Sequence, residues 1–209
     1  MRRDLITSVL AVLVLTVMLG VAYPLVITGI SQVAFPGKAN GSKIVRNGQV
    51  VGSKLLAQPF VIDTGRKDKA GTPITRPNPR YFQPRPSQTN YNPAATAFSN
   101  RGPNDASAPA FYRAQLASYL KLERPFDAGL TAVKVPVDAV TTSASGVDPD
   151  VSQANARIQA HRVAAVRHLP LDRVMSLVSD HTDGRFLGVF GEPGVNVTEL
   201  NLALDQLSR

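Results

Sequence analysis

Residues 5–30 read LITSVLAVLVLTVMLGVAYPLVITGI, an apolar run that is almost unbroken. No residue from 5 to 35 is charged. About 20 apolar residues are enough for an α-helix to cross a bilayer, because each residue adds about 1.5 Å to its length. The run therefore predicts one N-terminal transmembrane helix, which we place at residues 5–34.

Arg2 and Arg3 precede this run and set its expected orientation. Positive residues that flank a span usually remain in the cytoplasm. We therefore expect a single-pass protein of the plasma (inner) membrane, with residues 1–4 in the cytoplasm and residues 35–209 on the outer side. A signal peptide cleaved near residues 20–22 is the alternative, but its apolar region would be only about 7–15 residues long. The longer run favours a permanent anchor.

Four residues of the span indicate a face that packs against another protein's helices: Thr16, Gly20, Tyr23 and Pro24. Thr16 and Gly20 are four residues apart and small, which allows a second helix backbone to come close. Pro24 cannot donate a hydrogen bond to the Gly20 carbonyl, so it predicts a kink. Since a lone span has no helix of its own chain to pack against, these features favour an external partner.

Charge is unevenly distributed beyond the span. Residues 38–113 hold 12 Lys and Arg against three Asp, whereas residues 114–209 hold nine against 11 Asp and Glu. A basic segment favours anionic headgroups, an acidic partner surface or nucleic acid, unless it is simply a solvated loop. Nucleic acid is not expected as a partner, because the segment is rich in Pro and Gly, lacks a recognition helix and lies beyond a membrane span.

Hydrophobic periodicity and capping residues predict a small α+β or α/β domain outside the membrane. Helices are expected at residues 107–123, 152–168, 170–180 and 198–207. Strands are expected at residues 45–51, as a hairpin around Asn47 and Gly48, and at residues 53–62, 133–140 and 185–190.

A Pro-rich basic loop is predicted at residues 63–109, which contain eight prolines. Each proline removes a hydrogen-bond donor and restrains the residue before it, so no regular element is expected there. The aromatic residues Tyr81, Phe82, Tyr91 and Phe98 indicate that the second half of the loop packs on the domain.

Catalytic and metal-binding patterns are absent from the sequence. The chain has no Cys, no Gly-x-Ser-x-Gly elbow and no phosphate-binding loop. His161 and His168 are two helical turns apart, too far to share a metal, and a site that adds His181 is not favoured. We therefore expect no catalytic residues and no metal: the chain is not an enzyme on its own.

The turn at residues 141–146 and the following Asp148-Pro149-Asp150 combine hydroxyls, a glycine and carboxylates. Such groups could bind a cation or cap the next helix. Capping is favoured, because free N–H groups and the helix dipole attract Asp and Ser to a first turn.

Short segments throughout the chain, in order, resemble the KdpC family of subunits of potassium-importing P-type ATPases. They are residues 20–25, 35–36, 39–42, 52–53, 58, 60, 81–82, 85–87, 91–93, 99–100, 140–148, 159, 162–164, 191–193, 195–197 and 200–205. The resemblance marks a turn (Thr141, Ser143, Ser145, Gly146 and Asp148) and a C-terminal segment (Asn196, Asn201 and Asp205). The main departure is a basic insertion within residues 61–80, from Arg66 to Arg80.

The resemblance implies three partners in a membrane complex: a potassium-conducting subunit, a P-type ATPase subunit and a small single-span subunit. It implies a non-catalytic role in assembly and stability, and a family role as a chaperone that raises the ATP affinity of the hydrolysing subunit. No cofactor is expected to bind firmly, so ATP would concern this chain only through the complex. The expected topology places residues 38–209 across the bilayer from ATP, so any influence would be indirect. The alternative function is a self-standing, membrane-anchored binding protein for an anion or a lipid headgroup.

Overall fold

A computed structural model describes residues 1–95, 97, 100–102 and 104–207. Phe98, one of the aromatic residues expected to pack, lies outside the described residues. The chain divides into two compact units, Met1–Val51 and Gly52–Arg209, which we describe separately.

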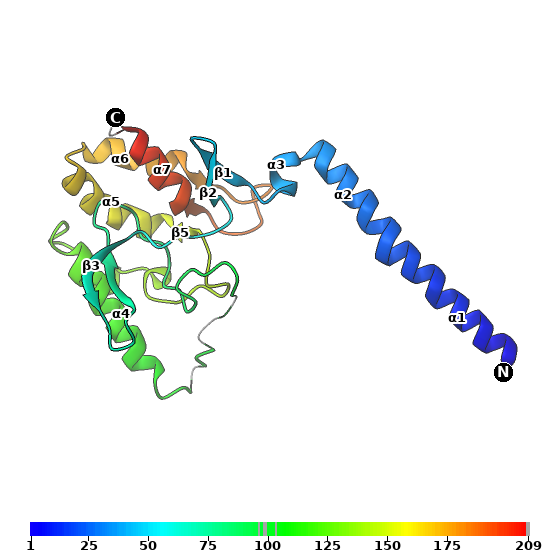
Figure 1. The fold of residues 1–209 in the computed structure, drawn as a ribbon. Coiled ribbons are helices and arrows are strands. Elements are labelled where there is room, and N and C mark those ends of the chain that lie inside the picture. The colour runs from blue at the N-terminus through cyan, green and yellow to red at the C-terminus, as the bar shows by residue number, and fades with distance from the viewer. Residues whose placement is uncertain (96, 98–99, 103, 208–209) are drawn as a thin grey trace. The chain divides into compact units, whose positions relative to one another are not determined.

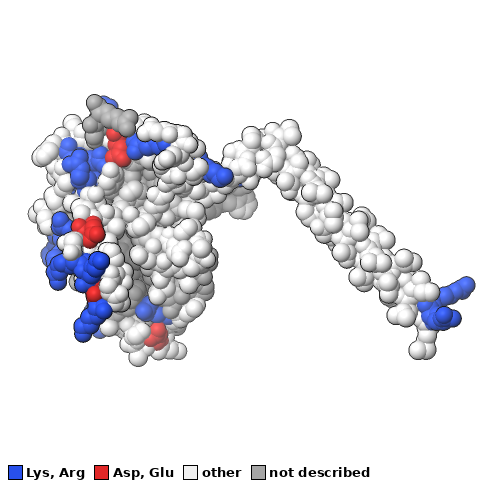
Figure 2. Space-filling model, in the orientation of Figure 1, with Lys and Arg blue, Asp and Glu red and all other residues white. Residues whose placement is uncertain are grey.

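The first unit begins with one long helix. It consists of α1 (Arg2–Val17), a π-helical turn (Met18–Ala22) and α2 (Tyr23–Ala34). By length and composition this is the one helix among the described residues that could cross a membrane. Figure 2 shows it as white along its length, with blue at the end that carries Arg2 and Arg3.

The π-helical turn lies where Pro24 was expected to disturb the helix. The Tyr23 N–H donates to the carbonyl of Met18, five residues earlier rather than four. Such a wide turn is one of the usual causes of a local change in helix direction. The regular α-helix is thus interrupted around Gly20, where the kink is expected; the kink itself stays a prediction.

A short helix, α3 (Pro36–Ala39), and a β-hairpin follow the long helix. The hairpin consists of β1 (Lys43–Arg46) and β2 (Gln49–Ser53). Asn47 and Gly48 connect the strands with φ angles of 51° and 77°. Two consecutive left-handed residues are typical of a tight hairpin turn, so the predicted hairpin is confirmed.

The prediction that residues 63–109 contain no regular element is wrong. Residues in the basic insertion form an antiparallel hairpin, β3 (Val61–Lys67) and β4 (Pro73–Pro77), with a register shift between Asp63 and Arg66. The prolines are tolerated because they stand at the two ends of β4 in a two-stranded sheet. The Asp68 carboxylate closes the turn by accepting hydrogen bonds from the N–H groups of Ala70 (2.8 Å) and Thr72 (2.9 Å). The strand expected at 53–62 is wrong as a single element, because β2 ends at Ser53 and β3 begins at Val61.

The rest of the second unit mixes helices with one small sheet, which confirms the mixed fold class (Figure 1). The sheet is antiparallel in the order β5-β7-β6. Its elements and the helices around it are α4 (Ala108–Glu123), β5 (Asp150–Ser152), α5 (Gln153–Arg167), α6 (Leu171–Asp180), β6 (Thr182–Asp183), β7 (Gly194–Asn196) and α7 (Val197–Leu207).

Two predicted strands are wrong. Residues 133–140 form two short 3-10 turns, Ala132–Lys134 and Val137–Ala139, on either side of Pro136, which has no N–H to give to a sheet. Residues 185–190 turn back on themselves through Leu187 (φ 53°) and Gly188 (φ 79°), so only Phe186 and Phe190 pair.

Helix α5 lies at the centre of the core and is buried around much of its circumference. Its alanines, Ala156, Ala160 and Ala164, let neighbouring elements approach closely. The other core residues come mainly from β5, α6, β7 and α7, and from the Pro-rich segment in the case of Phe82: they are Phe82, Val151, Val163, Val174, Val178, Val195, Val197, Leu200 and Leu204. The fully buried Phe82 confirms that the second half of the predicted loop packs on the domain.

Candidate functional site

The most elaborate polar arrangement of the second unit surrounds residues 79–83, which we call the clamped segment. This stretch follows β4 and belongs to no helix or strand. Side chains from α5 and α7 bind its backbone instead. The arrangement depends on residues far apart in the sequence, so it holds the Pro-rich region against the helical core.

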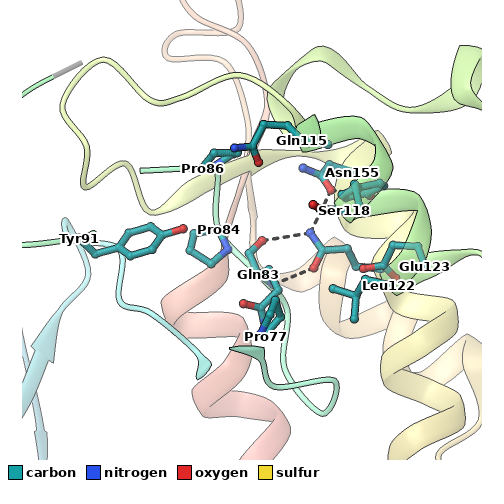
Figure 3. A pocket seen from close by; sticks show the side chains of 13 residues that line it. Pro77, Gln83, Pro84, Pro86, Tyr91, Gln115, Ser118, Leu122, Glu123 and Asn155 are labelled. Atoms are coloured by element: carbon teal, nitrogen blue, oxygen red, sulfur yellow. Dashed lines mark hydrogen bonds between the residues drawn. The ribbon is translucent and has the colours of Figure 1, made fainter. Parts of the chain in front are cut away.

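Two side-chain amides pair with consecutive residues of the clamped segment. Asn201 accepts a hydrogen bond from the Phe82 N–H and donates one to the Phe82 carbonyl, both at 2.9 Å. Gln159 accepts from the Gln83 N–H (2.7 Å) and donates to the Gln83 carbonyl (3.0 Å). Dashed lines at Gln83 in Figure 3 mark these two hydrogen bonds. Each amide therefore satisfies the backbone as a neighbouring strand would.

Arg162 holds the start of the clamped segment from α5. Its Nη1 donates to the carbonyls of Pro79 (2.6 Å) and Tyr81 (3.0 Å), and its Nη2 donates to Gln159 Oε1 (3.0 Å). Its Nε lies 3.0 Å from both carboxylate oxygens of Glu123 in α4. Both side chains are fully buried. Burial raises the pKa of Glu123, and the Arg162 guanidinium opposes that rise.

Arg167 and Asp205 close the other side of the segment. The Arg167 Nε donates to the Arg80 carbonyl (2.7 Å), and its Nη2 forms an ion pair with Asp205 (3.0 Å). The Tyr81 hydroxyl donates to the same carboxylate (2.9 Å), and the guanidinium lies over the Tyr81 ring. Burial, followed by the contact with Asp205, raises the pKa of Tyr81.

The turn at residues 141–148 receives the chain that follows the clamped segment. Ser87 donates to the Gly146 carbonyl (2.6 Å), and the buried Ser143 donates its N–H to the Pro86 carbonyl (3.0 Å). Arg85 contacts both ends of the turn, namely Thr141 Oγ1 (3.3 Å) and the Asp148 carboxylate (3.2 Å). These turn residues thus hold the Pro-rich chain in place.

Gly146 has a structural reason to lack a side chain. Its φ angle is 76°, and a Cβ atom there would lie 2.6 Å from Thr89 Oγ1 and 3.2 Å from the Ala97 carbonyl. The neighbouring Tyr91 donates its hydroxyl to the Arg85 carbonyl (2.8 Å), and burial raises the pKa of Tyr91 to about 12. The turn and the Pro-rich chain are therefore in close contact.

The stretch of residues 141–150, which was expected to cap the next helix, does not provide the cap of α5. Asp148 Oδ1 accepts from the Asp150 N–H (3.1 Å), and β5 separates it from α5. Ser152 is the cap, since its Oγ accepts from the Asn155 N–H (3.1 Å). Asp138 supports this end of α5 by accepting from Ser152 Oγ (2.8 Å) and Asn155 Nδ2 (2.9 Å). Ser145 plays a local part: its Oγ accepts from the N–H two residues on.

Asn196 lies at the join between β7 and α7. Its Oδ1 accepts from the Glu199 N–H (3.0 Å), which satisfies a free donor of the first helical turn. Its Nδ2 donates to the Lys54 carbonyl (2.8 Å). The residue therefore begins a helix and also binds the chain that arrives from the first unit.

The face marked by Thr16, Gly20, Tyr23 and Pro24 is not buried by the residues that the structure describes. A Cβ atom on Gly20 would meet only Thr16 Cγ2, at 3.9 Å, which is an ordinary contact. The helix itself therefore has room for a larger residue at position 20. That this face docks on a partner remains a prediction.

The chemistry that these side chains allow is limited. A pocket of about 190 Å³ lies between α4 and the chain at Pro84 and Pro86, with Tyr91 and Gln115 at its side (Figure 3). In the described ranges no three His, Cys, Asp or Glu residues are grouped so that they could hold a metal ion. The polar side chains around the clamped segment bind its backbone, which indicates a scaffolding role.

Three residues of this arrangement were missed by sequence reasoning: Glu123, Asp138 and Arg167. Glu123 and Arg167 look like ordinary residues at helix ends, and their burial depends on packing against distant segments. Gln159 and Arg162 entered only through the family resemblance. Their spacing was a signal, however. Asn155, Gln159 and Arg162 are polar residues at positions that share one side of α5, and all three are buried there.

Comparison with known proteins gives a consistent result. The family described as "KdpC: K+-transporting ATPase, c chain" matches residues 5–206. Three relatives each carry the name potassium-transporting ATPase KdpC subunit. The one from Streptomyces coelicolor is 42% identical, over 94% of this chain and 89% of its own length. The one from Mycobacterium bovis is 41% identical over 99% and 100%, and the one from Ralstonia nicotianae is 44% identical over 92% and 86%. This chain belongs to the KdpC family.

Proposed function

We propose that this chain is a non-catalytic subunit of a high-affinity, ATP-driven potassium import complex, and that it stabilises the assembled complex. The observation that carries the proposal is the family match over residues 5–206, whose description names a K+-transporting ATPase. The apolar helix Arg2–Ala34 supports a place in the membrane. The expected partners are a potassium-conducting subunit, a P-type ATPase subunit and a small single-span subunit.

The proposed division of labour gives the helix the contact inside the membrane and the domain a contact outside it. The small pair Thr16 and Gly20 is suited to close packing with a partner helix. The clamped segment is held by side chains from two helices, so this part of the domain is ordered before it docks. A segment that is already ordered loses little conformational entropy when it docks.

The second part of the proposal is that this chain modulates ATP use by the hydrolysing subunit. If the N-terminus lies in the cytoplasm, the domain lies across the bilayer from the nucleotide. A rise in the ATP affinity of the hydrolysing subunit would then be a coupling free energy between separate sites, carried by the helix or by the other subunits. Loss of this chain should raise the ATP concentration needed for half-maximal hydrolysis.

The helix contact can be tested by Gly20→Leu, with Gly29→Leu as the matched control. Both glycines lie in the long helix, and neither position is crowded within its own chain. We expect Gly20→Leu to reduce copurification of the other subunits and potassium-stimulated ATP hydrolysis, and Gly29→Leu to leave both near the unmodified level. Equal behaviour of the two variants would contradict a specific face at Gly20. Intact assembly and hydrolysis after deletion of the whole chain would contradict the proposed function itself.

The alternative function has one observation in its favour. The β3–β4 hairpin exposes four cationic side chains, Arg66, Lys67, Lys69 and Arg76. A self-standing binding protein could use them to hold an anion or a lipid headgroup. Purification from native membrane under mild conditions distinguishes the two functions. The alternative requires that this chain purifies without other subunits.

A further inference from the structure

The loop between β6 and β7 exposes apolar side chains that no described residue covers. Residues 183–192 are all exposed, and we call residues 184–193 the apolar loop. Four large apolar residues stand at its tip with high exposed fractions: Phe186 (71%), Leu187 (76%), Val189 (68%) and Phe190 (62%). Such a cluster on an otherwise folded domain marks a surface that is covered by something else.

The backbone N–H and carbonyl groups at the tip of this loop pair largely with one another. The Phe186 N–H donates to the Phe190 carbonyl (2.8 Å), and the Phe190 N–H donates back to the Phe186 carbonyl (2.9 Å). The N–H groups of Gly188 and Val189 also donate inside the loop. Internal pairing of polar groups is the requirement for placing backbone in an apolar medium. The tip therefore exposes apolar side chains, while most of its backbone N–H groups are already hydrogen-bonded within the loop.

The loop begins and ends close to the point where the chain enters the second unit. Lys54 and Leu56 are bound there by Asn196 Nδ2 (2.8 Å) and Thr198 Oγ1 (3.1 Å). Asn196 is the last residue of β7, and the loop joins the other end of this strand, at Gly194. A three-residue strand is about 10 Å long, so the base of the loop lies near the entry point.

The chain between the long helix and the entry point is a short tether, whatever the orientation of the two units. The hairpin of β1 and β2 returns on itself and adds only about one strand spacing of 5 Å. Helix α3 adds about 6 Å, and the remaining residues, Phe35 and 40–42, add at most about 14 Å. The connecting chain itself can thus span at most roughly 25 Å.

We propose that the apolar loop inserts its tip into the interfacial layer of the lipid bilayer that holds the long helix. Phenylalanine and leucine side chains are the usual apolar contribution of segments that lie in a membrane interface. Arg185 and Glu192 form an ion pair at the base (3.0 Å), which keeps charge at the level of the headgroups and leaves the tip without any. The loop would thus fix one face of the domain toward the membrane.

The absence of Cys from the chain allows a direct test. A nitroxide is attached to Val189→Cys in the full chain, reconstituted alone in nanodiscs of phosphatidylcholine and phosphatidylglycerol. Collisions with oxygen, which concentrates in lipid, are compared with collisions with a water-soluble nickel chelate. Val133→Cys is the matched control, because Val133 is 96% exposed and lies outside the apolar loop. We expect Val189→Cys to favour oxygen and Val133→Cys to favour the chelate.

A second variant tests the cause. Phe186→Ser with Phe190→Ser, in the Val189→Cys chain, keeps the backbone pairing and removes the two largest apolar groups. We expect the immersed population to fall by at least about tenfold. Leu187→Ser alone serves the same purpose if the double variant does not fold. A Val189 probe that matches the Val133 probe in nanodiscs would overturn the proposal, and so would protection that appears only after the other subunits are added, because the loop would then bind protein.

Discussion

Asn201 pairs with Phe82 as a strand would: its amide accepts from the N–H and donates to the carbonyl of that one residue, both at 2.9 Å. Gln159 does the same for Gln83. Through these two residues, helices α5 and α7 act as the missing neighbours of an extended segment. The clamped segment is therefore ordered by side chains, without a sheet.

Asn201→Leu should destabilise the second unit by about 2–4 kcal/mol, because it leaves a buried N–H and a buried carbonyl without partners. Leucine has the branched shape of asparagine and a larger volume, so no cavity forms and some crowding adds to the loss. Hydrogen exchange of the full chain in detergent measures the effect directly. We expect faster exchange at Phe82 in particular.

Gln206→Leu is the matched control for Asn201→Leu, since Gln206 lies on the same helix and is exposed. It should change the free energy of unfolding by less than about 0.5 kcal/mol. If both variants have the same stability, the amide pairing at Phe82 contributes little to the fold.

Arg162→Met should cost about 3–5 kcal/mol, because Glu123 is then left as an unpaired buried carboxylate. The Pro79 carbonyl loses its donor as well, whereas the Tyr81 carbonyl keeps the one from Gln83 Nε2 (3.1 Å). Removing the guanidinium also removes the interaction that opposes burial, so the pKa of Glu123 should rise further. Denaturant unfolding, followed by near-ultraviolet circular dichroism of the tyrosines, gives the free energy.

The sign of the pH dependence distinguishes this cause from simple loss of packing. A carboxyl whose pKa is raised on folding binds its proton more tightly in the folded state, so stability increases as pH falls through the raised pKa toward the ordinary value of 4.5. Arg162→Met should therefore recover part of its loss as the pH is lowered from neutral toward 4.5. Arg162→Met with Glu123→Gln should show no such recovery. A loss that is independent of pH would contradict the assignment to Glu123.

Gly146→Ala should destabilise the contact between the turn and the Pro-rich chain. Gly71→Ala is its matched control, because Gly71 also has a positive φ (81°) but has no atom within 4 Å of a new Cβ. Backbone strain alone should cost about 1 kcal/mol at both positions. Crowding by Thr89 and the Ala97 carbonyl should add at least about 1 kcal/mol at Gly146.

Thermal unfolding of the two glycine variants measures this difference. Adding Thr89→Ala to Gly146→Ala should restore part of the loss, since the two residues touch and their effects should not add. Equal destabilisation by Gly146→Ala and Gly71→Ala would show that Gly146 is needed only for its φ angle.

The sequence predicts those parts of the fold whose signal is local. The apolar run, the Asn47-Gly48 turn and helices with clear periodicity, such as α6, all appear near their expected positions. The predictions are wrong where contacts with residues distant in the sequence determine the secondary structure. The β3–β4 hairpin forms in spite of its prolines, and the expected strand at 133–140 forms turns, because strand formation depends on pairing that periodicity does not reveal.

The candidate site was predictable only in part for the same reason. The resemblance identified Asn201, Asp205 and Gly146 as motif residues, but it did not indicate what they contact. Asn201 and Phe82 are 119 residues apart, and no local pattern predicts that a side-chain amide will pair with the backbone of so distant a residue. Buried polar residues of this kind become interpretable once the segment that they hold is known.

Asp150 gives a prediction of opposite sign, in which removal of a charge stabilises the protein. Burial raises the pKa of Asp150 above its ordinary value of 3.8, and the neighbouring Asp148, Asp183 and Glu199 raise it further. One of its carboxylate oxygens, Oδ1, is buried and has no hydrogen-bond partner among the described residues. Asp150→Asn should therefore increase stability near neutral pH, though by no more than about 1 kcal/mol, because solvent screens a half-buried site.

The pH profile decides whether charge is the cause. The raised pKa means that the folded state binds the proton of Asp150 more tightly, so ionisation lowers stability as pH rises through that pKa. The advantage of Asp150→Asn should accordingly shrink as pH falls and vanish below pH 3.8, where the unfolded carboxyl is also protonated. Asp148→Asn should lower stability instead, because Asp148 pairs with Arg85 at 3.2 Å. A uniform gain for Asp150→Asn across this range would point to better packing, since only the electrostatic cause requires the gain to depend on the ionisation of residue 150.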